Sequence, residues 1–148
     1  MEVKLQCRKE NKETYISMLE AAGFVITDTA HLTFKEDDYV SDTFIAKKGE
    51  ATVLVAYQEV VFIESFGNQI HLHTLRDTLE IKERLYEIAG MYEDKGFIRI
   101  NKSQIVNKAM IQEIRPQINS KFTLVMKNKA KIDVTRSYLL QFKEAIGL

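Results

Sequence analysis

The chain has 148 residues, of which 45% are hydrophobic and 28% are charged, proportions typical of a globular protein and not of a disordered one. This length suits one domain, or one domain with a small additional unit. No apolar stretch approaches the roughly 20 residues that cross a bilayer, and the first residues contain no apolar signal-peptide core. The single cysteine cannot form an internal disulfide. These features predict a cytoplasmic protein without a membrane partner.

The net charge of zero conceals opposite charges in the two parts of the chain. Residues 1–94 contain 10 Lys or Arg against 18 Asp or Glu, whereas residues 95–148 contain 11 against 3. Such segregation is typical of a protein that binds a polyanion with its basic part. A basic, solvated face on the C-terminal elements explains the same counts equally well, so charge alone leaves both interpretations open.

Residues 1–45 are predicted to form a small β-α-β-β unit. Residues 3–7 alternate like a strand, and the segment from Asn11 to Gly23 has a suitable cap, a suitable end and one apolar helical face. Two short β-like runs, FVIT and HLTF, follow the helix. The acidic and polar residues 35–42 would form a linker or an exposed loop.

Residues 46–148 are predicted to form a second, mainly β domain. Residues 43–57 are typical of a hairpin that turns at Lys48-Gly49, and a second hairpin turns at Phe66-Gly67-Asn68. Further β-like runs cover residues 97–100, 104–107, 110–118, 122–126 and 131–134. The lone Pro116 favours an edge position for its strand.

Two short helices are expected within this domain. Residues 79–92 place Ile81, Leu85, Ile88 and Tyr92 on one helical face. Residues 137–148 close the chain with a second amphipathic pattern. The fold class is therefore mainly β, and α+β overall, with antiparallel strands.

The sequence contains no recognisable enzyme signature and no pattern that calls for a cofactor. A nucleophile elbow is absent, and the six glycines are too scattered for a phosphate-binding loop. His71 and His73 would share one face of a strand, as metal ligands can, but no Cys, Asp or Glu completes a set at a known spacing. A pair of half-exposed histidines, or an edge that contacts a ligand, is favoured over a metal site.

Binding of a polyanion is the remaining prediction. The basic residues of the second half lie in or between β-runs, which favours loops and strand ends over a single recognition helix as contacting elements. The polar segment Asn101-Lys102-Ser103-Gln104 lies between two such runs and offers amide, ammonium and hydroxyl groups together. Lysine binds phosphates without regard to sequence, whereas reading bases requires shaped donors and acceptors.

Three separated stretches resemble one known family. VVFIESFGNQIHLHT, FIRINKSQIVNKAMIQEI and VTRSYLLQFK occur in the order seen in LytTR-type DNA-binding domains of bacterial transcription regulators. The resemblance covers about residues 50–148. It implies an elongated, mostly antiparallel fold of about ten strands. It also implies that loops contact successive major grooves of double-stranded DNA and bend it.

The resemblance assigns three DNA-contacting segments. They are Asn68, Gln69, Ile70 and His71; Asn101, Lys102 and Ser103; and Thr135, Arg136 and Ser137. The family often has His at the position of Asn101, and Ser followed by two basic residues at the positions of the third segment. Asn68 can instead serve only its turn, and Ser103 only the backbone.

Two functional hypotheses follow. The first is a cytoplasmic, sequence-specific transcription regulator that binds paired DNA repeats as a homodimer. Family members usually carry a receiver domain ahead of the DNA-binding domain, and residues 1–45 are too short for one. They are expected to mediate dimerisation or to respond to an unidentified regulatory partner. The alternative is a protein-interaction or adaptor module whose basic C-terminal half binds an acidic partner.

Overall fold

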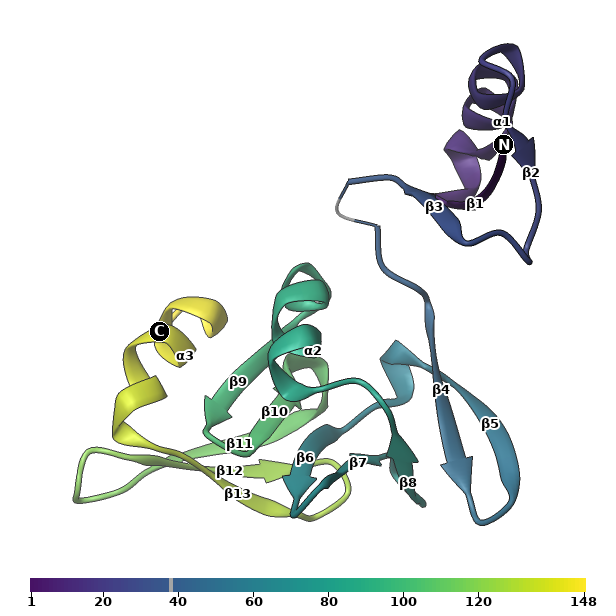
Figure 1. Ribbon diagram of the computed structural model, residues 1–148. Coiled ribbons are helices and arrows are strands. Elements are labelled where there is room, and N and C mark those ends of the chain that lie inside the picture. The colour runs from purple at the N-terminus through teal and green to yellow at the C-terminus, as the bar shows by residue number, and fades with distance from the viewer. Residues whose placement is uncertain (38) are drawn as a thin grey trace. The chain divides into compact units, whose positions relative to one another are not determined.

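A computed structural model describes residues 1–37 and 39–148 and divides the chain into two compact units, Met1–Val40 and Ser41–Leu148 (Figure 1). The boundary thus lies a few residues before the one expected from the sequence, because β4 (Thr43–Lys48) belongs to the second unit. Asp38, within the acidic segment predicted as a linker, lies outside the described residues.

The first unit is a three-stranded parallel sheet with one helix. Its elements are β1 (Glu2–Gln6), η1 (Lys9–Asn11), α1 (Lys12–Ala21), β2 (Val25–Ile26) and β3 (Leu32–Lys35), and the strand order is β2-β1-β3. Helix α1 returns the chain to the start of β1, which is why β2 runs parallel to β1. The helix buries Leu19, and the Tyr15 ring lies 5.8 Å from that of Phe34 on β3.

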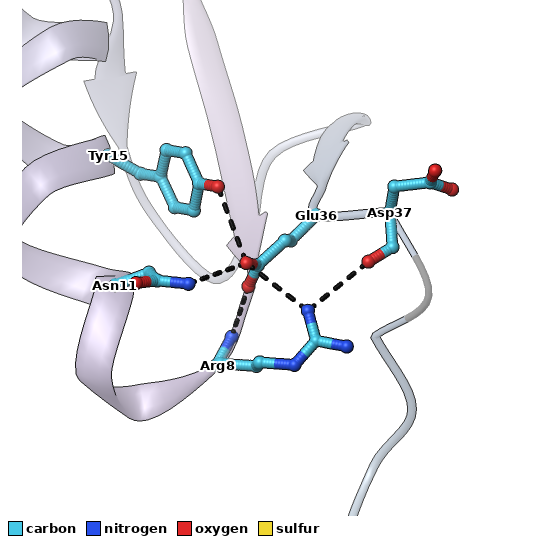
Figure 2. A network of polar contacts seen from close by, with 5 residues as sticks. All are labelled: Arg8, Asn11, Tyr15, Glu36 and Asp37. Atoms are coloured by element: carbon cyan, nitrogen blue, oxygen red, sulfur yellow. Dashed lines mark hydrogen bonds and ion pairs between the residues drawn. The ribbon is translucent and has the colours of Figure 1, made fainter. Parts of the chain in front are cut away.

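The end of β3 is attached to the start of α1 by one carboxylate, that of Glu36 (Figure 2). It accepts hydrogen bonds from the backbone N–H of Arg8 at 2.7 Å and from the Asn11 amide at 2.6 Å. The Arg8 guanidinium lies 3.2 Å away, and the Tyr15 hydroxyl donates at 3.3 Å. The Arg8 backbone N–H, more than any other group, lowers the pKa of Glu36 below its ordinary value.

The second unit contains ten strands and two α-helices (Figure 1). One antiparallel sheet has the order β5-β4-β8-β7-β6-β10-β9, and a second has the order β11-β12-β13. The bounds are β5 (Ala51–Ala56), β6 (Phe62–Phe66), β7 (Gln69–His73), β8 (Thr78–Ile81), α2 (Leu85–Met91), β9 (Phe97–Asn101), β10 (Gln104–Asn107), β11 (Ile111–Pro116), β12 (Phe122–Met126), β13 (Lys131–Val134) and α3 (Leu139–Ile146). Short 3-10 turns lie at Tyr57–Glu59, Glu93–Lys95, Lys108–Met110 and Arg136–Tyr138. The predicted fold class is confirmed, and Pro116 ends an edge strand.

The helix predicted at residues 79–92 is wrong in its first part. Residues Thr78–Ile81 form strand β8, and α2 begins only at Leu85. Leu79 and Ile81 are buried while Thr78 and Glu80 are exposed, which is the alternation of a strand. Ile81 lies four residues before Leu85, so the end of the strand imitates a helical repeat. Pairing with β7 on one side and β4 on the other decides the conformation.

One buried cluster joins the two sheets to α3. It includes Phe62 and Ile100 of the large sheet, Leu124 and Val134 of the small sheet, and Phe142 of α3. The contact fixes the small sheet and the start of α3 beside β9. Strand ends from both sheets are therefore held in defined positions by a common core.

Candidate nucleic-acid interface

The three predicted segments lie at one end of the second unit. Strand β6 ends where its antiparallel neighbour β10 begins, with Gln104 opposite Glu64. The turn after β6 and the turn before β10 therefore lie at the same end of the large sheet, and the Ser65 N–H donates to the Ser103 carbonyl at 2.9 Å. The third segment joins them because the Thr135 N–H donates to the carbonyl of Ile100, near the end of β9, at 3.0 Å.

The first segment presents three of its four predicted side chains. Gly67 has φ +62° at the first position of a two-residue turn, which glycine adopts without strain. Asn68 and Gln69 are exposed, and the Gln69 amide oxygen lies 3.1 Å from Nε2 of the half-buried His71. Ile70 is only 5% exposed and points into the core, so its side chain is not available to DNA.

Sequence reasoning missed an exposed aromatic side chain beside this segment. Phe66 is 71% exposed, and its ring lies nearly parallel to that of His71, with centroids 5.9 Å apart. The register pairs Phe66 with Gln69 and Glu64 with His71, so all four side chains belong to one face. The sequence could have indicated this position, because strand alternation places Phe62, Glu64 and Phe66 on the same face of β6.

Asn101 of the second segment is used within the protein. Its Nδ2 group donates to Oε1 of Gln104 at 2.7 Å and to the Asp133 carbonyl at 2.9 Å. Its Oδ1 atom accepts from both the backbone N–H and the hydroxyl of Ser103, at 2.9 and 3.1 Å. Both hydrogens and the acceptor of the amide are thus engaged. Asn101 shapes the turn, while Lys102 and Ser103 at its tip are exposed.

The side chain of Arg99 stabilises the same turn through its backbone carbonyls. Its Nε atom donates to the Asn101 carbonyl at 3.3 Å, and its Nη2 atom donates to the Lys102 carbonyl at 2.6 Å. Because the planar guanidinium binds two successive backbone carbonyls, it restricts the backbone conformation of the turn. The side-chain ammonium of Lys102, by contrast, makes no hydrogen bond or ion pair with any described residue.

A line of polar contacts continues from this turn across the large sheet. Gln104 donates from Nε2 to the Glu64 carboxylate at 3.1 Å, and the other Glu64 oxygen lies 2.8 Å from Nε2 of His73. The His73 ring also stacks on Phe62 with centroids 4.2 Å apart. His73 is therefore a structural partner of Glu64. Among the described residues, no three His, Cys, Asp or Glu side chains are placed to hold a metal ion.

The third segment forms the entry to α3. Thr135 precedes a 3-10 turn at Arg136–Tyr138, and α3 follows directly. Thr135, Arg136 and Ser137 are all exposed, and the Arg136 guanidinium has no hydrogen-bond or ion-pair partner among the described residues. Lys102 and Arg136 are therefore two unpaired cations on neighbouring segments.

Three further cations of the basic half lie at the end of the unit opposite the three segments. Strand β13 runs from Lys131 toward the third segment, because Val125 pairs with Lys131 and Phe122 with Val134. Lys127 and Lys129, in the turn before β13, therefore lie at the opposite end. Lys108, just after β10, also lies at that end, and its Nζ atom donates to the Ala145 carbonyl at 3.3 Å. The positive charge is not one continuous patch.

Comparison with known families decides the classification. Residues 50–147 match the LytTr DNA-binding domain. The chain belongs to this family. No helix in the described part of this LytTr-family chain has the length and apolar character required to cross a membrane. The family is defined by DNA binding and not by an enzymatic reaction.

Several relatives share the LytTr region. Sensory transduction protein LytT of Bacillus subtilis (strain 168) is 30% identical over 100 residues, which make up 68% of this chain and 42% of that protein. Sensory transduction protein LytR of Staphylococcus saprophyticus is 34% identical over 95 residues, or 64% of this chain and 37% of that protein. Transcriptional regulatory protein LytR of Staphylococcus aureus (strain N315) is 28% identical over 95 residues, or 64% of this chain and 39% of that protein. The chain spans less than half the length of these relatives.

A solved LytTr DNA-binding domain from Bacillus cereus has the same fold. It superimposes with a TM-score of 0.70 at 26% sequence identity, and the match covers 74% of this chain and 100% of that domain. The mostly antiparallel β fold implied by the sequence resemblance is thus confirmed.

Proposed function

We propose that this chain is a sequence-specific, DNA-binding transcription regulator that acts in the cytoplasm. The observation that carries the proposal is the common position of three exposed segments, two of which present unpaired cations, in a LytTr domain. Phosphate attracts such cations, while exposed amide and guanidinium groups are suited to base edges. The segments would enter successive major grooves, and the DNA would bend to meet them.

The exposed side chains have different roles in this proposal. Lys102 is a flexible point charge and contacts phosphate, whereas the planar guanidinium of Arg136 matches the two acceptors of guanine. Asn68 and Gln69 offer amide groups that suit adenine. His71, Ser103, Thr135 and Ser137 complete the surface. Ile70 and Asn101 have no group free for DNA and hold the segments in place.

We further propose that the first unit mediates homodimerisation. All four residues of its edge strand β3 are exposed, including Leu32 at 51% and Phe34 at 37%. A free strand edge with apolar side chains favours pairing with another chain. The exposed acidic residues Glu10, Glu13 and Glu20 would repel phosphate, which disfavours DNA contact by this unit. A dimer would bind two repeats whose centres lie about one helical turn, 10–10.5 bp, or a multiple apart.

Selection of duplexes from a random library, followed by titration at several salt concentrations, tests the function. We expect one recurring sequence, and an affinity that falls steeply with salt because counterions are released from phosphates. A similar affinity for every duplex would contradict sequence-specific binding. A flat salt dependence together with equal binding to an acidic polypeptide would favour the adaptor hypothesis, in which Lys108, Lys127 and Lys129 contact a protein partner.

A further inference from the structure

The hairpin between β11 and β12 ends in an exposed tip that none of the three segments includes. The Gln117 N–H donates to the Lys121 carbonyl at 2.9 Å, which leaves Ile118, Asn119 and Ser120 as a three-residue tip. Ser120 has φ +58°, the left-handed conformation that closes three-residue hairpins and that glycine usually supplies. Ile118 is 106% exposed, so its whole side chain lies in solvent.

This tip lies at the same end of the unit as the three segments. Phe122, at the start of β12, pairs with Val134, the last residue of β13, so the hairpin extends past the point where the third segment begins. Figure 1 shows the β11–β12 turn beside the entry to α3. At about 3.3 Å per residue, the tip reaches roughly 7 Å beyond the last strand pair, or about two base-pair steps of DNA.

Asp133 connects the hairpin to the second and third segments. Its carboxylate accepts from Thr123 Oγ1 at 2.8 Å and pairs with Lys121 Nζ at 3.2 Å, both at the base of the hairpin. Its carbonyl accepts from Asn101, and Thr135 follows two residues later. The tip is therefore held at a defined position relative to Lys102 and Arg136, and Lys121 offsets the negative charge of Asp133.

The chemistry of the tip is suited to the outer edge of a nucleic-acid groove. Arg115 is paired with Glu113 at 2.9 Å and Lys121 with Asp133 at 3.2 Å, and residues 114–126 contain no acidic side chain, so the tip itself does not repel phosphate. Gln117, Asn119 and Ser120 supply hydrogen-bond donors for phosphate oxygens. Ile118 supplies an apolar surface that fits the deoxyribose rings between the phosphates.

We infer that the hairpin tip, residues 117–120, is a fourth DNA-contacting segment. It lies on the sugar–phosphate backbone about two base pairs outside the bases contacted by the third segment. It adds affinity and lengthens the bound site without reading sequence. This inference rests on the proposed DNA-binding function and extends it to flanking DNA.

Hydroxyl-radical footprinting and titration of the full chain test the inference, with duplexes that the wild-type chain selects from a random library. The double variant Ile118→Ser, Asn119→Ala is compared with Leu54→Ser, since Leu54 is 68% exposed on β5 and lies outside the hairpin. We expect the double variant to lose protection at one flank and about five- to tenfold in affinity, the effect of one apolar contact and one hydrogen bond at an interface rim. Leu54→Ser should match the wild type.

Shortening the duplex on that flank gives a second readout. Wild-type affinity should fall by the same factor, whereas the double variant should bind the long and short duplexes equally well. The inference is overturned if the wild-type footprint ends at the bases next to the third segment, or if the variant binds the long duplex like the wild type. In either case binding at the three segments would persist and the proposed function would stand. If the wild-type chain selects no duplex, the proposed function and this inference both fail.

Discussion

The side-chain amide of Asn101 donates a hydrogen bond of 2.9 Å to the backbone carbonyl of Asp133, which attaches the turn after β9 to the last strand of the chain. The same Nδ2 group donates to Gln104, and its Oδ1 atom accepts from Ser103. Two of the three proposed contact segments thus depend on one amide. The geometry of the interface is built before any DNA is bound, which reduces the ordering cost of binding.

Asn101→Asp should destabilise the fold and weaken DNA binding for all sequences alike. The aspartate would place an acceptor against the Gln104 oxygen and the Asp133 carbonyl, and would leave that carbonyl without its donor. We expect a loss of about 1–3 kcal/mol in the free energy of unfolding, measured with urea. Asn119→Asp is the control for stability, because Asn119 is exposed and its side chain has no hydrogen bond to another described residue. Equal stability of the two variants would show that the amide network contributes nothing.

Lys102→Ala should weaken binding to every duplex by a similar factor. The exposed ammonium has no partner among the described residues, and a flexible point charge mainly contacts phosphate. The slope of log affinity against log salt should become shallower by about one unit. Lys129→Ala is a matched control, since Lys129 is exposed at the opposite end of the unit. A change of sequence preference in Lys102→Ala would instead place this side chain on a base.

Arg136→Ala should relax the preference at one base pair. The exposed guanidinium is unpaired within the part of the chain that the structure describes, and a bidentate contact with guanine contributes about 1–3 kcal/mol of discrimination. Competition between the selected duplex and its single-base variants measures the effect. Arg136→Lys keeps the charge and loses the planar fork, so it should restore affinity more than preference. If Arg136→Ala lowers the affinities for selected and random duplexes in the same ratio, Arg136 does not read a base.

The sequence predicted local features of the fold more reliably than contacts between distant residues. Gly67 and the alternation around it located a hairpin correctly, because turn chemistry and strand period depend on adjacent residues. The expected helix at residues 79–92 was wrong at its start. There, pairing with strands on both sides of β8 favoured a strand, although Ile81 also fits the helical repeat that continues with Leu85.

The candidate site shows the same difference between local features and contacts between residues far apart in the sequence. The resemblance assigned three segments, and the fold brings them to one end of the second unit. It gave no sign that the side chain of Asn101 is hydrogen-bonded to Asp133, which is 32 residues away. Glu64 and Gln104, which support the same turn, are 40 residues apart and were not predicted as partners. Residue type and spacing identify a polar turn. Whether its side chains face outward depends on which strands the fold brings beside it.

Glu36→Gln should destabilise the first unit at neutral pH and less so in acid. Hydrogen bonds from Arg8 and Asn11 lower the pKa of Glu36 below its ordinary value of 4.5, so the ionised form is favoured by folding. A lowered carboxyl pKa contributes stability that is present above the unfolded-state pKa and is lost as the pH falls through the folded-state pKa. The difference between wild type and variant should therefore shrink below about pH 4.5.

NMR provides the measurement for this prediction, with the amide resonance of Arg8 as the local probe and urea unfolding at each pH as the global one. Glu13→Gln is the control, because Glu13 is an exposed glutamate of the same unit without a described partner. A wild-type advantage that does not change between pH 7 and pH 3 would contradict the assigned role of the Glu36 carboxylate.

Removal of residues 1–40 should abolish self-association and leave single-repeat DNA binding nearly intact. The second unit, Ser41–Leu148, contains all three segments, the network that supports them and its own core. The exposed edge of β3 and its side chains Leu32 and Phe34 belong to the first unit, and so do the acidic residues that disfavour DNA contact. The truncated chain should sediment as a monomer and gain no affinity from a second repeat, because linkage between two copies is lost.

The double variant Leu32→Lys, Phe34→Lys tests the same proposal in the full-length chain. Charges on an edge strand oppose pairing with an identical strand, so the variant should also be monomeric while its second unit stays folded. Met18→Lys, which adds a charge at a 59% exposed position on α1 and outside β3, is the control for charge alone. If the truncated chain remains dimeric, self-association resides in the second unit. If it stays folded but no longer binds a single repeat, the first unit takes part in DNA contact, and its proposed role is wrong.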